Sequence, residues 1–473
     1  MAGSAPEPAL RHSEVVFMYR SADEVYRRYG ATFLGWGGAH TAGEVERHHD
    51  LHMRCTGSMW CLTAGAERLY QDAELRRAVV LDIEGRPVEV PWLFDGTHHG
   101  QKNLFGCTNH PVFRELNRQH VRRAMAGSAD GLHVDDHLGT AHAAIRYGGG
   151  LCDYCIAGFR EYLKAHASRE QLSEAGASDL TTFDYRELIR KFATTRDEYI
   201  AVRGQIPLMD LFKRFHLEAA AENVRQLGEL AAEVAGHDVL LSANTCLCHG
   251  PMHHAVVKHL THMVAEIDQH AEQGLARVED TLAAYRTAVR LGKPLAATAY
   301  GQDWWAVKHR DLRELVRFWI ALAYAHGQRF MVPHPGSQWC FHPDHGQDHY
   351  QAPVEEFAPL YQFIRANAEQ FDGFEEDGEA GVETGDGVLC TARRNGERTV
   401  VHVLNLDYDA SADRMRPRRD VTVRIAKPLP TAPRARLLSY DGPAQTIPVR
   451  DEGDMLTLEL PELRLWSMVV PGK

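Results

Sequence analysis

The stretch Gly131-Leu-His-Val-Asp-Asp-His137 carries the strongest indication of the fold, because a short apolar strand runs directly into two adjacent carboxylates. Leu132 and Val134 alternate with polar neighbours, as in a buried strand, and Asp135 and Asp136 follow where the strand should end. Side chains alternate along a strand, so one of these two aspartates should point into the mouth of the sheet. Charge at the carboxyl end of a parallel strand is typical of the rim where α/β folds bind ligands. The alternative is that the aspartates cap the next segment or pair with an arginine.

The composition is that of an ordinary globular protein. The 473 residues are 44% hydrophobic and 25% charged, and the formal net charge is -12. An acidic chain is a poor partner for nucleic acid or an anionic membrane, so neither is expected. The first residues lack the apolar core of a signal peptide, and no apolar run approaches the roughly 20 residues of a membrane span. Nine cysteines, an odd number, then suggest reduced thiols and a cytoplasmic enzyme, and a homo-oligomer remains open.

Short apolar runs alternate with amphipathic helical stretches over residues 1–373. The eight predicted strands are Val15–Tyr19, Ala31–Gly37, Gly57–Leu62, residues 131–136, Asp238–Ala243, His262–Ile267, Pro294–Tyr300 and Arg329–Val332. The main predicted helices are Ala22–Tyr29, Glu44–Met53, Pro111–Met125, Arg277–Leu291, Asp311–His326 and Val354–Glu369. This succession predicts a (β/α)₈ barrel of the TIM type, with insertions at about 78–110 and 151–235. A doubly wound sheet is the alternative, because the third strand pattern is weak.

Residues 374–473 have a different pattern. The runs become short, rich in β-branched residues and separated by Pro, Gly and Asp. The predicted strands are Gly387–Ala392, Thr399–Asn405, Asp420–Ile425, Arg434–Tyr440, Met455–Leu460 and Leu465–Val470. We therefore expect an all-β, antiparallel sandwich domain after the barrel.

The residues at the predicted strand ends are carboxylates, aromatic rings, an amide and imidazoles. There is no phosphate-binding glycine loop and no G-x-S-x-G nucleophile motif. Indole and phenol rings stack on the C–H face of a sugar, and carboxylate, amide and imidazole groups bind its hydroxyls. The predicted substrate-binding residues are Trp36, Trp60, His98, His99, Asn109, Asn244, His270, Tyr300, Asp303, Trp305 and His334.

Paired carboxylates indicate glycosidic bond cleavage. One carboxyl group protonates the leaving oxygen, and the other attacks the sugar or activates water, at a separation of about 5–9 Å. Strands 4 and 6 of a barrel can bring such a pair together. We predict that Asp135 or Asp136 stays ionised, and that Glu266, or Asp268 in its place, has a raised pKa and acts as the acid.

The sequence resembles uncharacterised barrel glycoside hydrolases related in pattern to the barrel β-galactosidases. The likeness rests on Asp130-Gly-Leu-His-Val-Asp-Asp136, on Cys107-Thr-Asn-His-Pro111 and on Val401-His-Val-Leu-Asn-Leu-Asp-Tyr408. The run Gly148-Gly-Gly-Leu-Cys-Asp-Tyr-Cys-Ile-Ala-Gly-Phe-Arg-Glu-Tyr-Leu163 belongs to it as well, and the likeness is strongest over residues 105–165. Barrel β-galactosidases use glutamates after strands 4 and 7, whereas strand 7 here is followed only by Asp303. An aspartate on strand 4 with an acid on strand 6 resembles the α-galactosidase group instead, so the anomer stays open.

The cysteines allow two interpretations. The resemblance implies that Cys107, Cys152 and Cys155 hold a structural zinc ion, although zinc takes four ligands. Alternatively, Cys152, Cys155 and Phe159 are the buried stripe of a helix, since their spacing fits one helix face. A second, weaker zinc candidate is the run Cys246-Leu-Cys248-His249.

Two other classes of function remain open. A metal-dependent hydrolase would coordinate a divalent ion through His133, Asp135, Asp136, His137 and His270. A carbohydrate-binding barrel would keep the sugar site without turnover. No organic cofactor is expected in any of these cases, and the expected partner is a small glycoside or an oligosaccharide.

Overall fold

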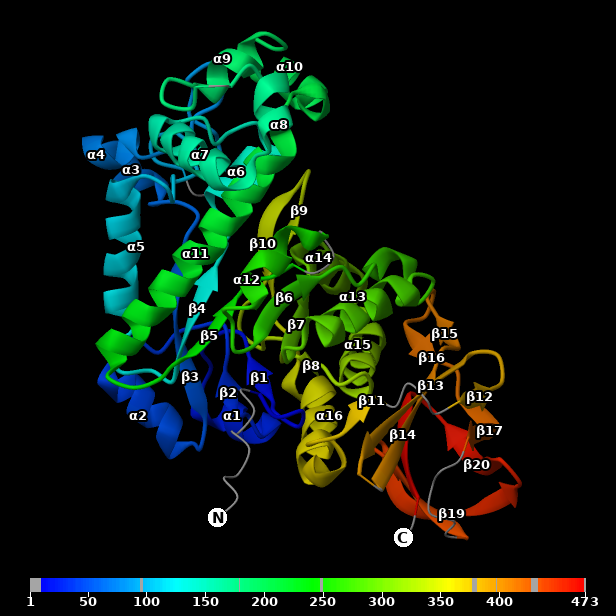
Figure 1. The fold of residues 1–473 in the computed structure, drawn as a ribbon. Coiled ribbons are helices and arrows are strands. Elements are labelled where there is room, and N and C mark those ends of the chain that lie inside the picture. Colours follow the sequence, from blue (N-terminus) through cyan, green and yellow to red (C-terminus); the bar gives the residue numbers. More distant parts are fainter. Residues whose placement is uncertain are drawn as a thin grey trace, which may run out of the picture.

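The computed structural model describes residues 10–93, 97–177, 179–246, 250–376, 381–396, 398–426 and 433–471. None of the helices found there is both long and apolar enough to cross a bilayer. The chain forms a βα barrel, a helical layer over one end of it, and a C-terminal antiparallel sheet (Figure 1).

Eight parallel strands form the barrel. They are β1 (Val16–Phe17), β2 (Phe33–Leu34), β3 (Arg54–Trp60), β4 (Gly131–Asp135), β5 (Leu240–Ala243), β6 (Met263–Ile267), β7 (Leu295–Ala299) and β8 (Arg329–Phe330). The strands pair in the order β1 to β5 and β6 to β8. Parallel bridges from Asn244 to Val264 and from Phe17 to Val332 join the two groups, so the ring closes. The alternative of a doubly wound sheet is therefore wrong, because such a sheet would leave two free edges. The third strand, whose sequence pattern is weak, is seven residues long.

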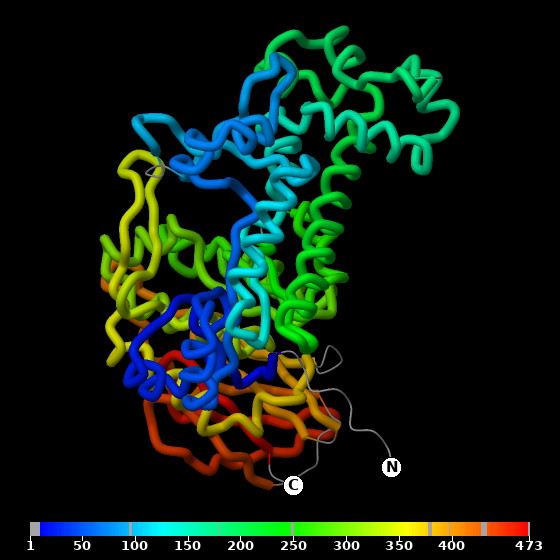
Figure 2. The backbone as a smooth tube through the Cα atoms, turned by 90° about the vertical axis from the view of Figure 1, so that its left-hand side faces the viewer, coloured from blue at the N-terminus to red at the C-terminus, as the bar shows by residue number. Residues whose placement is uncertain are grey.

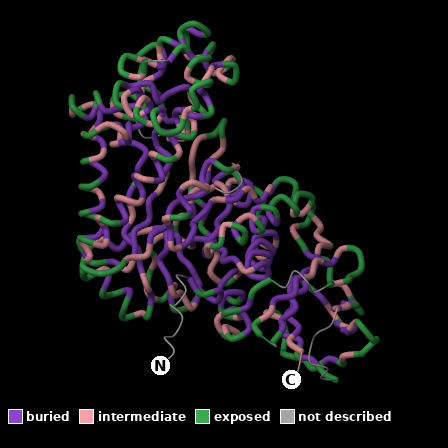
Figure 3. Tube along the Cα trace, in the orientation of Figure 1, coloured by how far each residue is buried: buried purple, intermediate pink, exposed green. Residues whose placement is uncertain are grey.

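Helices surround this ring, and the residues of the strands inside them are mostly buried (Figure 3). They are α1 (Asp23–Tyr29), α2 (Ala42–Asp50), α5 (Pro111–Ala124), α11 (Met209–Ala235), α12 (His254–Val257), α13 (Val278–Leu291), α15 (Arg313–Ala325) and α16 (Val354–Ala366). Local sequence determines their ends: a capping box between Thr41 and Glu44 starts α2, and Gly292 ends α13 in the left-handed region at φ 68°.

The second insertion builds a helical layer above the mouth of the barrel. It contains α7 (Asp153–His166), α8 (Arg169–Glu174), α9 (Tyr185–Arg190) and α10 (Arg196–Val202), and α6 (Thr140–Arg146) comes just before it. The first insertion is preceded by α3 (Ala66–Gln71) and α4 (Ala73–Arg77). This layer has its own apolar core, which includes Phe159, Tyr185 and Phe212. Helix α11 belongs to both parts, because its first half packs in this core and its second half covers β4 (Figure 1). Helices α9 and α10 are separate, with residues 191–195 of the predicted insertion between them.

The sequence pattern missed two elements near the mouth. Helix α14 (Gly301–Arg310) directly follows β7, and a hairpin of β9 (Gln338–His342) and β10 (Gly346–Tyr350) follows β8. Figure 2 shows this hairpin rising above the strands of the barrel. Short 3₁₀ turns are η1 (Arg203–Gln205), η3 (Pro251–His253), η4 (Ala271–Gln273) and η5 (Ala368–Gln370).

The C-terminal part is one nine-stranded antiparallel sheet that folds over on itself. Its order is β11-β13-β14-β21-β18-β19-β20-β17-β12, and an apolar core lies between its two halves. The strands are β11 (Glu375–Glu376), β12 (Val382–Thr384), β13 (Val388–Asn395), β14 (Arg398–Asn405), β17 (Arg418–Ala426), β18 (Arg434–Ser439), β19 (Gly442–Glu452), β20 (Met455–Leu463) and β21 (Trp466–Pro471). The small pair β15 (Tyr408–Asp409) and β16 (Arg414–Met415) lies beside it. Asp413 joins the sheet to the barrel by accepting the Glu314 and Leu315 backbone N–H groups, at 2.8 and 3.1 Å, which caps α15.

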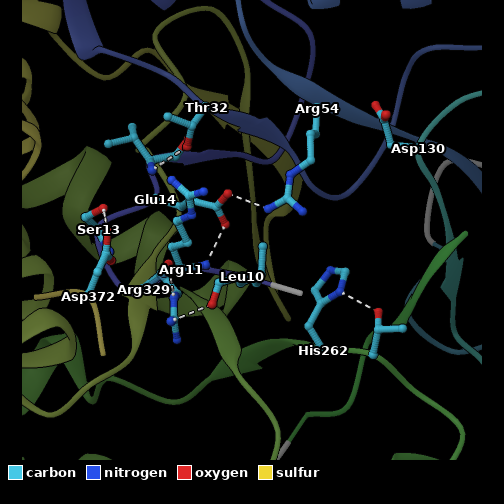
Figure 4. Close-up of polar contacts among 12 residues, drawn as sticks. Leu10, Arg11, Ser13, Glu14, Thr32, Arg54, Asp130, His262, Arg329 and Asp372 are labelled. Atoms are coloured by element: carbon cyan, nitrogen blue, oxygen red, sulfur yellow. Dashed lines mark hydrogen bonds and ion pairs between the residues drawn. The ribbon is translucent and has the colours of Figure 1, made fainter. Parts of the chain in front are cut away.

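A buried ionic network ties the N-terminal segment to the opposite end of the barrel from the mouth (Figure 4). Glu14 forms an ion pair with Arg54 of β3, and its second oxygen accepts the Arg11 backbone N–H at 3.1 Å. Arg329 of β8 donates to the Leu10 carbonyl at 3.0 Å. Burial raises the pKa of Glu14, and Arg54 opposes that rise. Groups at this end of a barrel serve stability rather than catalysis.

Candidate active site

A cavity of about 1650 Å³ opens at the carboxyl ends of the barrel strands. Its lining includes Asp135 of β4, Asn244 after β5 and Glu266 of β6. The first insertion contributes one side of the wall, through Trp92, and the β9–β10 hairpin contributes another, through Trp339. The cavity therefore joins the barrel mouth to the segments that rise above it.

Asp135 is a buried carboxyl group that accepts several hydrogen bonds at the mouth of the barrel. Asp135 is two residues after His133 on β4, so its side chain points to the same inner face of the barrel and enters the mouth. The Trp60 indole N–H donates to Oδ2 at 2.9 Å, and the Asp136 backbone N–H donates to Oδ1 at 2.9 Å. Burial raises the pKa of Asp135 above its ordinary value, and these donors, with Asn244 and Trp36, offset only part of that rise. Hydrogen bonds to the charged form favour that form.

Asp136 occupies a strained position beside it. Its φ of 48° lies in the left-handed region, which is uncommon for a residue other than glycine. Burial, followed by the negative charges of Asp135 and Glu266, raises the pKa of Asp136 well above its ordinary value. Because like charges in one site resist ionising together, Asp136 is the protonated member of the pair.

Glu266 is joined to Asp135 through Asn244. The Asn244 Nδ2 atom donates to Glu266 Oε2 at 2.9 Å and lies 3.5 Å from Asp135 Oδ1. These two carboxylate oxygens are therefore at most about 6.4 Å apart, the sum of the two contacts. Burial raises the pKa of Glu266 to about 7, with a further rise from the Asp135 charge and an opposing effect of Asn244. Glu266 is thus partly protonated near neutral pH, and it lies beside Asp135, which accepts hydrogen bonds from its neighbours.

Tyr19 and His334 complete this end of the cavity. Burial and the nearby Glu266 and Asp135 charges raise the pKa of Tyr19, so its hydroxyl stays protonated. The His334 Nδ1 atom accepts the Gly336 and Ser337 N–H groups, so Nε2 carries the proton and donates to the Arg20 carbonyl at 2.9 Å. The ring of His334 therefore holds the segment after β8 in place.

Comparisons with known proteins give similar sequences and similar folds. No family model matches the chain. The sequence is 23% identical over 313 residues to an alpha-agarase of Alteromonas agarilytica. This matched region covers 64% of this chain and 21% of the relative. The sequence is also 21% identical over 314 residues to an alpha-agarase of Thalassotalea agarivorans, with coverage of 64% and 21%. The chain thus spans only 21% of the length of these curated relatives.

Solved structures share the fold. An alpha-L-fucosidase isoenzyme 2 from Paenibacillus thiaminolyticus matches with a TM-score of 0.59 at 11% identity, over 98% of this chain and 99% of that one. An alpha-amylase from Geobacillus thermoleovorans, complexed with acarbose, matches with a TM-score of 0.54 at 10% identity, over 98% and 99%. A beta-galactosidase from Rahnella sp. R3 matches with a TM-score of 0.50 at 15% identity, over 75% and 54%.

The sequence relatives are alpha-agarases, and the solved structures show a shared fold. They do not single out the galactosidase groups, because fucosidase and amylase structures match as well.

The predicted site residues divide into two groups. Those that line the cavity are Trp36, Trp60, Asp135, Asp136, Asn244, Glu266 and His334. Those that lie outside its lining are His98, His99, Asn109, Asp268, His270, Tyr300, Asp303 and Trp305.

Local backbone geometry explains why the carboxylates of Asp303 and Asp268 lie outside the cavity lining. Asp303 lies on α14, where it accepts the Gln269 and Ala271 backbone N–H groups at 2.8 Å and so fixes the turn after β6. Asp268 lies beyond the end of β6 and is half-exposed, and it pairs with His270 at 3.2 Å. His270 also contacts Asp280, so it faces the outer surface.

The other predicted substrate-binding residues outside the lining make different contacts, and the missed helix α14 accounts for two of them. Tyr300 is the N-cap of α14, and Trp305 stacks on His345 with ring centroids 5.9 Å apart. Asn109 donates to the Cys155 sulfur at 3.4 Å. His98 and His99 contact each other edge-to-face in the first insertion.

Several lining residues were not among the predicted site residues. They are Tyr19, Arg20, His40, Arg68, Trp92, Asn103, His120, Arg123, Trp339, Gln347 and His349. Tyr19 ends the first predicted strand and Trp92 lies in the predicted insertion, so both carried a signal. The sequence carries no signal for the hairpin residues Trp339, Gln347 and His349, because no periodic pattern predicted β9 and β10.

The residues of the metal-dependent alternative do not converge. His133 is buried inside the barrel with Nδ1 3.0 Å from Ser242 Oγ, and His137 packs on His253. Within the described residues, the groupings suited to a metal ion do not include either of them or His270.

Three thiols do converge. The Sγ atoms of Cys107, Cys152 and Cys155 lie 3.4–3.5 Å from one another, and all three side chains are buried. Zinc–sulfur bonds of about 2.3 Å in a tetrahedron place sulfur atoms at nearly this separation, so the thiols fit one face of a zinc site. Cys152 is the N-cap of α7, while Cys155 and Phe159 are buried on that helix, so the helix-stripe interpretation holds only for the latter two. The second zinc candidate falls mostly on residues 247–249, outside the described part of the chain.

Proposed function

We propose that this chain hydrolyses an α-glycosidic bond in agar or an agar-derived oligosaccharide, with Glu266 as general acid and Asp135 as nucleophile. The observation that carries the proposal is the Asn244 amide, which contacts both carboxyl groups at the mouth of the barrel. The likeness to alpha-agarases supplies the substrate and the anomer. The different surroundings of the two carboxyl groups support the different roles, because environment separates acid from nucleophile in such pairs.

The first step divides the two roles. The Glu266 carboxyl group gives its proton to the glycosidic oxygen as the bond from that oxygen to the anomeric carbon breaks. Asp135 forms a bond to the same carbon, and a glycosyl ester results. The hydrogen bonds from Trp60 and the Asp136 backbone favour the ionised form of Asp135, which makes this attack, against the effect of burial.

The second step releases the sugar. The Glu266 carboxylate accepts a proton from a water molecule, whose oxygen attacks the anomeric carbon and displaces Asp135. Retaining enzymes place their carboxyl groups about 5–5.5 Å apart, and inverting enzymes about 6.5–9.5 Å apart. The upper limit of about 6.4 Å from the Asn244 contacts favours retention of configuration.

Substitution of Glu266 tests the assignment of the acid. With an agar oligosaccharide, whose leaving group needs a proton, Glu266→Gln should reduce kcat at least about 100-fold, the size of a general-acid contribution. With a dinitrophenyl glycoside, whose leaving group needs none, the first step should be nearly unaffected. Asp268→Asn is the matched control, because Asp268 lies outside the cavity lining. Equal losses for both substrates, or turnover by neither protein, would contradict the proposal, and binding without turnover would indicate a carbohydrate-binding barrel.

We also propose that Cys107, Cys152 and Cys155 would hold a zinc ion as thiolates. Hydrogen bonds from Cys107 and Cys155 lower the pKa of Cys152 to about 3, so one thiolate is available without the metal. The ion would tie the first insertion to the start of α7, and a fourth ligand would complete its tetrahedron. Its contribution would be to the stability of the wall of the cavity, not to the reaction.

A further inference from the structure

The wall of the cavity beyond Trp60 is basic, although the whole chain has a formal net charge of -12. We infer that Arg68, His120 and Arg123 bind an anionic substituent of the saccharide, either a sulfate ester or a carboxylate. The inference rests on the proposed function only in taking the anion to be part of a saccharide.

These three side chains form one group. His120 and Arg123 are three residues apart on α5 and therefore lie on the same face of that helix. Arg68 reaches the group from α3. Burial lowers the pKa of His120, and the Arg123 and Arg68 charges lower it further, so both guanidinium groups are near the ring.

The group of Arg68, His120 and Arg123 contacts Trp60, and Trp60 in turn contacts Asp135 at the catalytic end of the cavity. A hydrogen bond from the His120 ring to the Trp60 carbonyl opposes the fall in the pKa of His120. The Trp60 indole donates to Asp135, and Trp60 as a whole residue is 46% exposed. A sugar stacked on Trp60 would thus have the carboxyl pair at one edge and the basic group at the other.

The two arginines lack the usual compensation. By contrast, Arg20, which also lines the cavity, pairs with Glu44, and Arg122, on α5 but outside the lining, pairs with Glu115. Across the described residues, Arg68 and Arg123 have no ion-pair partner, and the one carboxylate lining this end, Glu67, contacts Gln71 instead. The guanidinium fork matches sulfate and carboxylate oxygens in two-point hydrogen bonds, which makes an anion of this kind the fitting ligand.

The opposite end of the cavity would repel the same ligand. Asp135, Asp136 and Glu266 lie there, and an anionic substituent beside them would raise the energy of an ionised Asp135. The charge difference between the ends would therefore orient the saccharide, with its anionic unit away from the bond that is cleaved.

Titration calorimetry in the Glu266→Gln background tests the inference without turnover. The probes are a sulfated agar hydrolysate and the same preparation after desulfation, and oligogalacturonate and its methyl ester. We expect one anionic probe to bind about tenfold more tightly than its neutral partner, the effect of one or two charged hydrogen bonds. The preference should fall with added salt. The probe that shows it identifies sulfate or carboxylate.

Charge-removing variants complete the test. Arg68→Gln with Arg123→Gln should abolish the preference, while affinity for the neutral probe, which also reports correct folding, stays unchanged. Arg118→Gln, on the same helix but outside the cavity lining, should keep the preference. Equal binding of anionic and neutral probes, or a preference that survives in the double variant, would overturn the inference. Turnover of the desulfated probe by the native enzyme is scored separately, since its absence would count against the proposed function alone.

Discussion

The Asn244 amide donates to Glu266 Oε2 at 2.9 Å, and this bond is the main opposition to the rise in the Glu266 pKa that burial causes. Glu266 must be protonated to act as an acid, so kcat/KM should fall as the pH rises through about 7. Asn244→Ala removes the donor and should move this alkaline limb to higher pH. An unchanged limb in the pH profile of the variant would show that the limb belongs to another group.

Two substitutions of Trp60 should separate its two roles. Trp60→Phe keeps a ring but removes the N–H group that donates to Asp135 Oδ2, so it should lower kcat about tenfold or more with little change in KM. Trp60→Ala also removes the stacking surface, so KM should rise as well. Trp305→Phe is the matched control, because that indole stacks on His345 and lies outside the cavity lining. Steady-state kinetics on an agar oligosaccharide measures all three, and equal KM values for both Trp60 variants would remove the stacking role.

Zinc binding by the three thiols should be visible by elemental analysis. Protein produced with zinc should contain about one ion per chain, and Cys107→Ser with Cys155→Ser should contain none. Because a structural zinc contributes to folding, a chelator should lower the Tm of the native protein but not of the double variant. Cys390→Ser, in β13, should behave like the native protein. If the native protein contains no metal and its Tm is unchanged by the chelator, the zinc site is excluded.

The ion pair between Glu14 and Arg54 should matter for stability. Arg54→Met leaves Glu14 buried without its partner, which should lower the free energy of unfolding by about 2 kcal/mol near neutral pH, less than the 3–5 typical of a fully buried pair, because Arg54 is partly exposed. The pKa of Glu14 is already raised by burial, and losing Arg54 raises it further. A raised carboxyl pKa costs stability above that pKa, so the deficit should shrink as the pH falls toward 4.5, the ordinary value.

Urea unfolding at the two pH values gives this difference. Arg47→Met, which breaks an exposed pair with Asp23, is the matched control and should cost about 1 kcal/mol or less at both. A deficit for Arg54→Met that is the same at both pH values would show that lost packing, not charge, is responsible.

The barrel strands could be predicted because apolar runs such as Leu132 and Val134 end at polar residues. The same rule predicted Asp135 and Glu266, which lie on strands whose inward parity can be counted. It misplaced Asp303 and Trp305, because α14 starts immediately after β7 and turns these side chains away from the mouth. Periodicity gives no information on such a turn.

The outer wall of the cavity illustrates a second limit. Arg68 and Arg123 come from different helices, and only packing brings them to one surface. The double role of α11 was equally hidden, because one continuous helical pattern covers the half that packs in the helical layer and the half that covers β4.

A double-mutant cycle tests the pairing of Asp135 and Glu266 most directly. The kcat/KM values of Asp135→Asn, Glu266→Gln and the double variant are measured on one agar oligosaccharide. Residues that act as a unit are strongly non-additive. We predict that each single variant loses at least about 100-fold and that the double variant is no slower than the slower single. A single variant within tenfold of the native enzyme, or losses that simply multiply in the double variant, would contradict the account.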